Sequence, residues 1–516
     1  MGREVSRRGF LKAAGAASGA ALLAGCSAGD LPLDGADFPS LDKGESFVGL
    51  ATSLTKELDY PALVEGQISR DLQGTLYRNG PGLFDRNGLR KRCILDGDGM
   101  VQAIRISNGK ARFQNRFVRT EKFLKEEASG RFQYETWTTQ RPGGWLVNIG
   151  ANIGNQAGVT VIRRGDHLYA FDESAQPYEL NPDTLETVGL SRLGLPDDKA
   201  VFAAHWKVDG ATGDWIHFGI EYGSESKLHV TTFDRDGRLA RHRVLEMPRE
   251  TYMHDFFVSQ RHIIFNLLAV DVSVFSFALG TSSFAGTFHY RDHYGNILLI
   301  IEREGDAEPV RIETESAWMW HTLNAYEEAD EIIADFVGYK DAKHFIGKDP
   351  GLYAIMEGRM GEWGAPGQIR RYVINLKKKR VKTEVLDRGN HEFPIVNPRL
   401  ACNRHRYGYF AATGSNEILY SSIIRVDMES GETESYDFGK GHYCGEPVFA
   451  PRPYYWYADD PKREPGWILT EVYSSHTRNS YIAILDAEGL FQGPQAIIHL
   501  DHHVPLSFHG YWHAGA

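Results

Sequence analysis

The apolar positions of this chain fall into short runs from about Val48 onward. Turn residues separate these runs at intervals of roughly 8 to 15 residues, a spacing typical of short strands. One run covers residues 215–222, and another, residues 228–233, leads into the turn Asp-Arg-Asp-Gly. Residues 371–376 and 380–386 form a further predicted hairpin. Long stretches with the period of a helix are scarce, so the pattern predicts an all-β chain.

So many strands need protection of their sheet edges, and radial repetition into a β-propeller provides it. No repeat of fixed period is visible, so the spacing alone does not give the number of blades. We expect one propeller domain over residues 48–516, interrupted by an apolar segment, 263–290. Polar residues within that segment argue against a transmembrane helix. It is either a buried strand and loop or an exposed apolar lip for a greasy substrate.

Composition narrows the class of partner. The 516 residues carry a net charge of −11, and no basic surface favours nucleic acid. Hydrophobic residues make up 42%, ample for a large core. Cys93, Cys402 and Cys444 are too few for a disulfide framework. The sequence allows a single disulfide between Cys402 and Cys444 but does not indicate one.

The N-terminus has the features of a targeting segment. Arg7 and Arg8 precede a weakly apolar stretch of small residues, which resembles a twin-arginine export signal. The sequence Leu-Ala-Gly-Cys then ends at Cys26 as a lipobox does. Residues 1–26 are therefore predicted to be a signal, Cys26 a lipid anchor and 27–47 a polar tether of a periplasmic protein. A plain signal peptide with an incidental Cys26 is the alternative.

Four histidines stand in strand-like aromatic runs, from which a side chain can point toward a shared axis: His205, His254, His321 and His509. They lie too far apart in the chain for a local zinc module, whose ligands come in closely spaced pairs. A propeller would draw inner strands from distant segments together. We predict that the four histidines converge and hold one iron ion.

Three glutamates in apolar contexts, Glu173, Glu392 and Glu446, are candidates to support these histidines. A ligating imidazole usually donates its second ring N–H to a carboxylate, which fixes the tautomer. For each glutamate, a salt bridge with a nearby arginine such as Arg399 or Arg452 is the alternative.

Several motifs together resemble the carotenoid cleavage oxygenase family over nearly the whole chain, from about Glu65 to Trp512. They are Gly-Thr-Leu-Tyr-Arg-Asn-Gly-Pro-Gly at 74–82, Leu-Asp-Gly-Asp-Gly-Met at 95–100, Ala-His-Trp-Lys-Val-Asp at 204–209, His-Thr-Leu-Asn-Ala-Tyr-Glu at 321–327 and Glu-Phe-Pro-Ile-Val-Asn-Pro-Arg at 392–399.

The resemblance implies a seven-bladed β-propeller with Fe(II) on its axis and a dome of loops and short helices over a substrate tunnel. The four histidines match the family's iron ligands. Glu173, Glu392 and Glu446 match the glutamates that orient the second, third and fourth of them. The implied reaction is cleavage of a conjugated C=C bond of a carotenoid or apocarotenoid by O₂ into two carbonyl products. A small apolar polyene, O₂ and a membrane surface met by segment 263–290 are the implied partners.

Two positions refine this expectation. Family members that cleave phenolic stilbenes carry a lysine where this chain has Asp172, and a carboxylate there would repel a phenolate. Val159 falls where the family places a small methyl-bearing residue beside the iron. Three alternatives stay open: the same chemistry on a stilbene or other aryl alkene, a non-redox isomerase, and a binding propeller whose metal is structural.

Overall fold

The computed structural model describes residues 33–34, 46–223, 225–347, 349–453 and 463–515. The predicted signal, including Cys26, and nearly all of the predicted tether lie outside the described residues.

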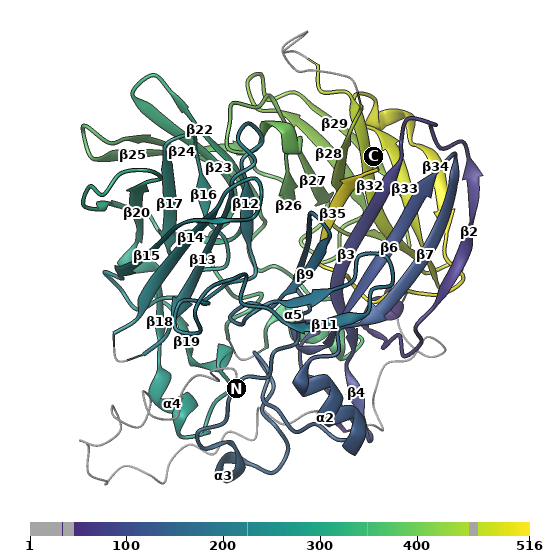
Figure 1. Cartoon of the computed structure of the whole chain (residues 1–516), viewed down its shortest axis with the longest axis horizontal. Coiled ribbons are helices and arrows are strands. Elements are labelled where there is room, and N and C mark those ends of the chain that lie inside the picture. Colours follow the sequence, from purple (N-terminus) through teal and green to yellow (C-terminus); the bar gives the residue numbers. More distant parts are fainter. Residues whose placement is uncertain (1–32, 35–45, 224, 348, 454–462, 516) are drawn as a thin grey trace.

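Five four-stranded antiparallel sheets follow one another along the chain (Figure 1). The first two are β8 (Thr160–Arg164), β9 (His167–Phe171), β10 (Tyr178–Leu180) and β11 (Thr187–Leu190), then β12 (Trp206–Val208), β13 (Trp215–Glu221), β14 (Lys227–Phe233) and β15 (Leu239–Glu246). The third is β16 (Phe257–Val258), β17 (His262–Leu267), β20 (Asn296–Glu302) and β21 (Val310–Thr314). The last two are β22 (Trp318–Glu328), β23 (Glu331–Tyr339), β24 (Gln368–Asn375) and β25 (Arg380–Asp387), then β26 (Asn390–Ile395), β27 (Tyr407–Thr413), β28 (Ser422–Asp427) and β29 (Thr433–Asp437). The prediction of an all-β chain is confirmed, and the sheets have a propeller-like arrangement.

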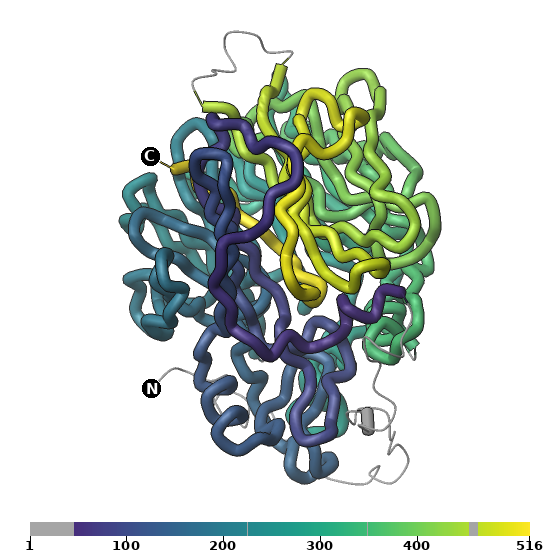
Figure 2. Tube along the Cα trace, turned by 90° about the vertical axis from the view of Figure 1, so that its right-hand side faces the viewer, coloured from purple at the N-terminus to yellow at the C-terminus, as the bar shows by residue number. Residues whose placement is uncertain are grey.

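A ten-stranded sheet brings the two ends of the described chain together. It contains β2 (Asp59–Gly66), β3 (Gly74–Leu83), β6 (Asp98–Ser107), β7 (Lys110–Phe117), β30 (His442–Cys444), β31 (Val448–Pro451), β32 (Gly466–Ser474), β33 (Asn479–Asp486), β34 (Pro494–His499) and β35 (His509–Ala514). The first half of β2 pairs with β7 and its second half with β34. Figure 2 shows this purple strand running beside the yellow C-terminal strands. β35 pairs with β3, so the last described strand lies beside one of the first.

The outermost strand of a sheet is much less buried than the middle strands. β23 is buried at every position but its first, whereas the outermost strand of the same sheet, β25, has no buried residue. β14 and its outer neighbour β15 show the same contrast. Strands covered on both faces are expected to be apolar throughout. The sheets therefore pack face to face near the centre and expose their outer edges.

Short helices gather at one end of the sheets, at the bottom of Figure 1. They are α2 (Glu121–Ser129), α3 (Trp145–Asn148) and α4 (Val274–Ala278), with α5 (Gly351–Met356) nearer the sheets. Thr120 begins α2 by accepting a hydrogen bond from Phe123 N, and Gly130 ends it with φ 66°, the left-handed conformation common after a helix. None of the described helices is both long and apolar enough to cross a membrane.

Small elements complete the described chain. They are β1 (Leu33–Asp34), β4 (Asp85–Arg86), β5 (Leu89–Arg90), β18 (Val270–Val272) and β19 (Phe288–Tyr290), with 3₁₀ turns at Val48–Ala51, Ile94–Asp96, Ala285–Thr287, Asp292–Tyr294, Pro398–Leu400 and Leu490–Gln492.

The apolar segment 263–290 is mostly buried. It continues from β17 through the hairpin of β18 and β19, with α4 between them. Phe277, Phe284 and Phe288 join the largest apolar cluster, whereas Phe275 on α4 is 57% exposed. Of the two interpretations the sequence allowed, burial holds for most of the segment and exposure for this side chain. Cys402 and Cys444 are buried free thiols, so the disulfide that the sequence allowed between them does not form.

Candidate metal centre

The four predicted histidines converge, although they stand in or shortly before strands of four different sheets. His205 directly precedes β12, His254 lies in the turn before β16, His321 is in β22, and His509 begins β35. The pairing of β22 with β23 shifts register on both sides of Thr322, next to His321. Such irregularities re-aim a side chain out of the regular alternation of a strand.

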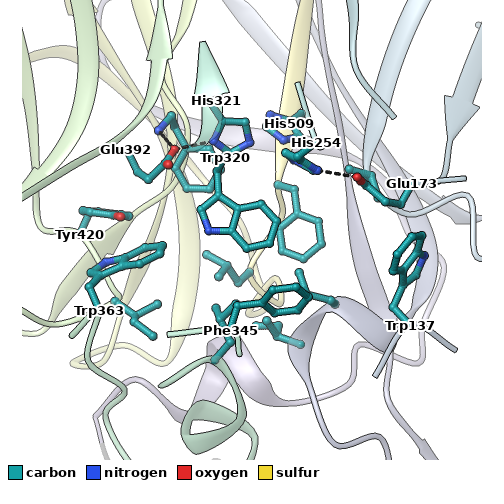
Figure 3. Close-up of a pocket in the computed structure, with 18 of the residues that line it drawn as sticks. Trp137, Glu173, His254, Trp320, His321, Phe345, Trp363, Glu392, Tyr420 and His509 are labelled. Carbon is teal, nitrogen blue, oxygen red and sulfur yellow. Dashed lines mark hydrogen bonds and ion pairs between the residues drawn. The ribbon is translucent and has the colours of Figure 1, made fainter. Parts of the chain in front are cut away.

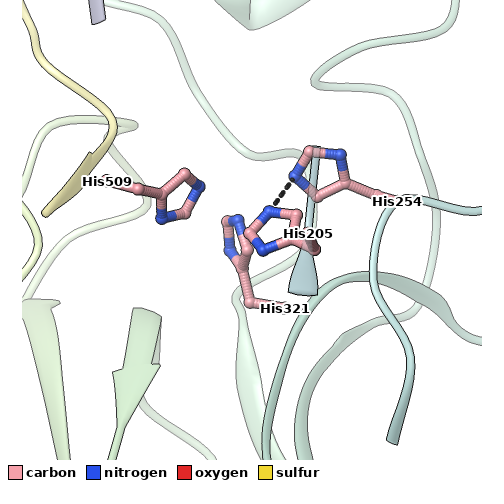
Figure 4. Close-up of side chains that lie close together, drawn as sticks. All are labelled: His205, His254, His321 and His509. Atoms are coloured by element: carbon pink, nitrogen blue, oxygen red, sulfur yellow. Dashed lines mark hydrogen bonds between the residues drawn. The ribbon is translucent and has the colours of Figure 1, made fainter. Parts of the chain in front are cut away.

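One nitrogen from each ring lies within 4.8 Å of the corresponding nitrogen of the other three (Figure 4). His205 Nε2 and His254 Nε2 are 2.9 Å apart. A first-row metal ion holds imidazole nitrogens at roughly 2.0–2.1 Å, which places those nitrogens about 3–4 Å from one another. Little contraction would be needed for four ligands, and His321 Nε2 is buried with no hydrogen-bond partner. The residues present therefore fit a single metal ion held by nitrogen alone.

Three of the rings donate their Nδ1–H to the predicted glutamates. The distances are 2.8 Å from His254 to Glu173, 2.5 Å from His321 to Glu392 and 2.8 Å from His509 to Glu446. A proton held on Nδ1 leaves the lone pair on Nε2 free to bind a metal.

Each of these glutamates has a second donor. Tyr252 donates to Glu173 and Tyr339 to Glu392, each at 2.9 Å, and the backbone N–H of Gly510 donates to Glu446 at 2.6 Å. The salt bridge proposed for Arg452 goes to Asp486 instead, at 3.1 Å. The carboxylates are thus fixed in place by partners other than arginine.

Burial and charge set the protonation of the rings. Burial lowers the pKa of His205 well below its usual value, and the neighbouring rings of His254, His509 and His321 lower it further. Burial also lowers the pKa of His509. Burial lowers the pKa of His321 as well, but the charge and hydrogen bond of Glu392 outweigh that effect and raise it overall. His205 and His509 are therefore neutral near pH 7, the form that ligates metal.

A cavity opens on one side of the four rings, and its walls are almost entirely apolar (Figure 3). It is lined by His254, His321 and His509 with Ile94, Leu95, Trp137, Val159, Asp172, Glu173, Tyr252, Trp320, Phe345, Leu352, Trp363, Glu392, Phe393, Ile418, Leu419, Tyr420, Cys444, Leu506 and Phe508. Val159 thus lines the same cavity as three of the histidines.

Asp172 also lines this cavity, as a buried carboxyl beside Glu173. It accepts hydrogen bonds from the backbone N–H of Gln156 at 2.6 Å and of Glu173 at 2.8 Å. Burial raises its pKa to about 6, so the group is mostly ionised at pH 7. A negative charge at this wall disfavours an anionic substrate.

A second cavity reaches the rings from the opposite side. His205, His321 and His509 line it together with the ion pair of Lys207 and Asp255, which are 2.8 Å apart. Its walls are more polar than those of the first. The histidine cluster therefore separates an apolar cavity from a partly polar one.

Sequence reasoning missed most of the aromatic walls. Trp320 and Tyr252 stand one and two positions before predicted ligands, and that proximity was an available signal. Trp137, Trp363 and Tyr420 come from loops, whose place beside the histidines depends on tertiary packing and left no pattern in the chain.

Comparisons with known proteins show the family to which this chain is similar. The family described as "Retinal pigment epithelial membrane protein" matches residues 51–514. An apocarotenoid-15,15'-oxygenase of Synechocystis is 31% identical over 87% of this chain and 92% of its own. Resveratrol cleavage oxygenase 1 of Aspergillus fumigatus is 26% identical over 87% of this chain and 91% of its own. The solved structure of cobalt-substituted Synechocystis apocarotenoid oxygenase superposes with a TM-score of 0.85 at 30% identity, covering 92% of this chain and 99% of that one.

Removing the charge of one supporting glutamate tests the role of these pairs. We expect Glu392→Gln to keep the fold but to lower the affinity for the metal about 10- to 100-fold, because His321 loses the charged partner that orients it. Metal analysis after dialysis at fixed Fe(II) measures this. Glu327→Gln is a matched control, since Glu327 binds His262 at 2.9 Å outside the cluster. Equal iron content in wild type and Glu392→Gln would refute the assignment.

Proposed function

Since the chain belongs to the carotenoid cleavage oxygenase family, which includes the retinal pigment epithelial membrane protein, we propose that it is an Fe(II)-dependent dioxygenase. In this proposal it cleaves a conjugated C=C bond of a carotenoid or apocarotenoid with O₂ and releases two carbonyl products. The observation that carries the proposal is the set of four histidines, three of them backed by glutamates, at the wall of an apolar cavity.

The proposed architecture is a seven-bladed propeller. Because β2 pairs with β7 by one half and with β34 by the other, the ten-stranded sheet divides into two blades that share this strand. These two blades and the five four-stranded sheets make seven. We place the iron on the common axis and assign the helices and loops at the bottom of Figure 1 to a dome over the substrate.

Iron bound by His205, His254, His321 and His509 would supply the chemistry with O₂. Four neutral imidazoles leave the ion its full charge, whereas most non-haem iron oxygenases use two histidines and a carboxylate. That a relative was solved in a cobalt-substituted form supports a transition-metal site. Glu173, Glu392 and Glu446 hold the negative charge outside the ligand set and keep the rings oriented.

The cavity walls position the substrate and exclude water. Trp137, Trp320 and Phe345 present rings to the space beside the histidines (Figure 3), and a flat conjugated chain can stack on such surfaces. Tyr252 lines the same cavity. Exclusion of water from the site also prevents side reactions. Binding, orientation and exclusion of water are therefore the tasks we assign to these residues.

The second candidate is the same chemistry on a stilbene or another aryl alkene. The relative named for resveratrol cleavage favours it. Asp172 opposes it for phenolates, because its buried carboxyl lies in the wall that such a substrate would meet.

Product analysis decides between these functions. With a β-apocarotenal we expect loss of visible absorbance that requires O₂, and mass spectrometry should detect two carbonyl fragments. A strong iron chelator should abolish the reaction and added Fe(II) restore it. If the protein cleaves a hydroxystilbene and not the β-apocarotenal, the second candidate function replaces the first. Isomerisation without O₂, or binding without any reaction, would refute the dioxygenase.

We also propose a peripheral membrane contact through an exposed apolar patch on α3 and α4. Trp145, Leu146, Val147, Ile149 and Phe275 are 40–66% exposed. The two helices adjoin, because Gly150 N donates to Ala278 O at 3.0 Å. Behind the patch, the buried Phe277 packs on Phe284, which packs on Trp137 in the cavity wall. A lipid surface at this patch would place an apolar substrate near the cavity.

Liposome flotation tests this contact in a chain that carries Cys26→Ser, which removes any lipid anchor. Leu146→Asp combined with Phe275→Asp should weaken binding at least about 10-fold, because two apolar side chains no longer enter the lipid. Phe491→Asp is the control, since Phe491 is 69% exposed elsewhere. Equal flotation of all variants would show that the patch does not meet the membrane.

Export by the twin-arginine route and a lipid on Cys26 complete the proposal, so the protein would act in the periplasm. Folding before export would let the metal bind in the reducing cytoplasm. Mass spectrometry of the mature N-terminal peptide should find a diacylglyceryl cysteine, and Cys26→Ser combined with Leu146→Asp and Phe275→Asp should release the protein from the membrane fraction. An unmodified Cys26 would refute the lipid anchor and favour the alternative, a plain signal peptide.

A further inference from the structure

His205 differs from the other three rings of the cluster. Glutamates hold His254, His321 and His509 by their Nδ1 atoms, whereas His205 has no carboxylate partner among the described residues. Its Nε2 nevertheless lies 2.9 Å from His254 Nε2, as close to the common centre as the others. The position of this ring therefore has to be set through the backbone that carries it.

Lys207 ties the segment of His205 to that of His254. It stands in β12, two positions after His205, and both side chains line the more polar cavity. Its Nζ lies 2.8 Å from one carboxylate oxygen of Asp255 and 2.9 Å from the other. Asp255 is the residue after His254 and is buried. The ion pair thus joins β12 to the turn before β16.

The same carboxylate also reaches the segment of His321. Thr322 donates to Asp255 Oδ2 from its backbone N–H at 2.9 Å and from its hydroxyl at 2.7 Å. The register of β22 shifts on both sides of Thr322, and its N–H is directed to Asp255. The backbone N–H of Phe256 donates to Oδ1 at 2.8 Å. One buried carboxylate therefore connects three of the four segments that carry the histidines.

Stability alone does not account for an ion pair at this place. Removing two charges from water costs about as much free energy as their attraction returns, so a buried pair is weak evidence for a stabilising role. Its directional bonds, however, fix the positions of the groups that it joins. Here those groups stand one or two residues from three of the candidate ligands.

We propose that Lys207, Asp255 and Thr322 form a clasp that positions His205 for metal binding, in place of the glutamate that each of the other rings has. This inference rests on the proposed function, because it needs a metal at the cluster. The members of the clasp are positioning residues, which act on the centre only through the rings. Without the clasp, the segment of His205 would be free to move away from that of His254.

The test measures the affinity of the metal-free protein for Co(II), the metal present in one solved relative. Lys207→Met removes the ammonium group and keeps most of the length of the side chain. The dissociation constant should rise about 10- to 100-fold, as for other residues that orient a metal ligand. Charge alone predicts the opposite result, because loss of a positive charge near the cluster strengthens the binding of a cation. The visible absorption bands of bound Co(II), which report its ligand geometry, should change as well.

Two further variants separate position from charge. Thr322→Val removes one hydrogen bond to Asp255 without changing any charge, and it should weaken Co(II) binding about 3- to 10-fold. Lys207→Arg keeps a cation beside Asp255 and should bind Co(II) nearly as wild type does. An effect of charge alone would leave the affinity of Thr322→Val unchanged.

Arg371→Met is the matched control, because Arg371 forms a comparable ion pair with the buried Asp335, at 2.7 Å, in the sheet that contains His321. Neither residue lines the two cavities at the histidines. This variant should lower the melting temperature, but the Co(II) affinity and absorption bands should stay as in wild type.

Unchanged or tighter Co(II) binding by Lys207→Met would overturn the inference, and so would unchanged binding by Thr322→Val or an equal loss in Arg371→Met. Wild type that binds the metal but cleaves no polyene would refute the proposed function and leave the clasp in place. Wild type that cleaves the polyene, with unchanged affinity in the clasp variants, would refute the clasp alone.

Discussion

Four imidazole rings lie within a few ångströms of one another, and the surrounding structure has to keep them neutral and correctly oriented. Burial and mutual repulsion keep His205 neutral. Glutamates hold His254, His321 and His509 by their Nδ1 atoms, so their Nε2 atoms are left for the centre. The carboxylates in turn need donors such as the Tyr252 and Tyr339 hydroxyls. Rigid partners two layers deep are what pre-organises a metal site.

Chain closure is part of the same constraint. His509 begins β35, and its backbone pairs with Asn79 of β3 near the other end of the chain. The side chain of Asn79 donates to the carbonyls of Ala157 and Thr160, next to Val159 in the cavity wall. A candidate ligand near the end of the chain is therefore positioned by a strand near its beginning. Such distant pairings slow folding, but they fix the ligand more firmly than a flexible tail would.

The sequence was sufficient for an all-β chain, and its resemblance to the family pointed to the four histidines and three glutamates that the structure brings together. It did not reveal that β2 divides between β7 and β34, since the hydrophobic pattern of a strand does not specify which strands it pairs with. It also missed Trp363 and Tyr420, which reach the cavity from loops. Periodicity reports which face of a strand is buried, whereas loop positions follow from packing across the whole molecule.

The two cavities give the cluster an uneven environment. On one side aromatic rings and Val159 exclude water, and on the other the pair of Lys207 and Asp255 stands close to the rings. Asp255 also accepts from the backbone N–H of Thr322 at 2.9 Å, beside His321. Electrostatic interactions are stronger beside the apolar cavity than beside the more polar one. The negative charges that orient the histidines thus act most strongly on the side where an apolar substrate would lie.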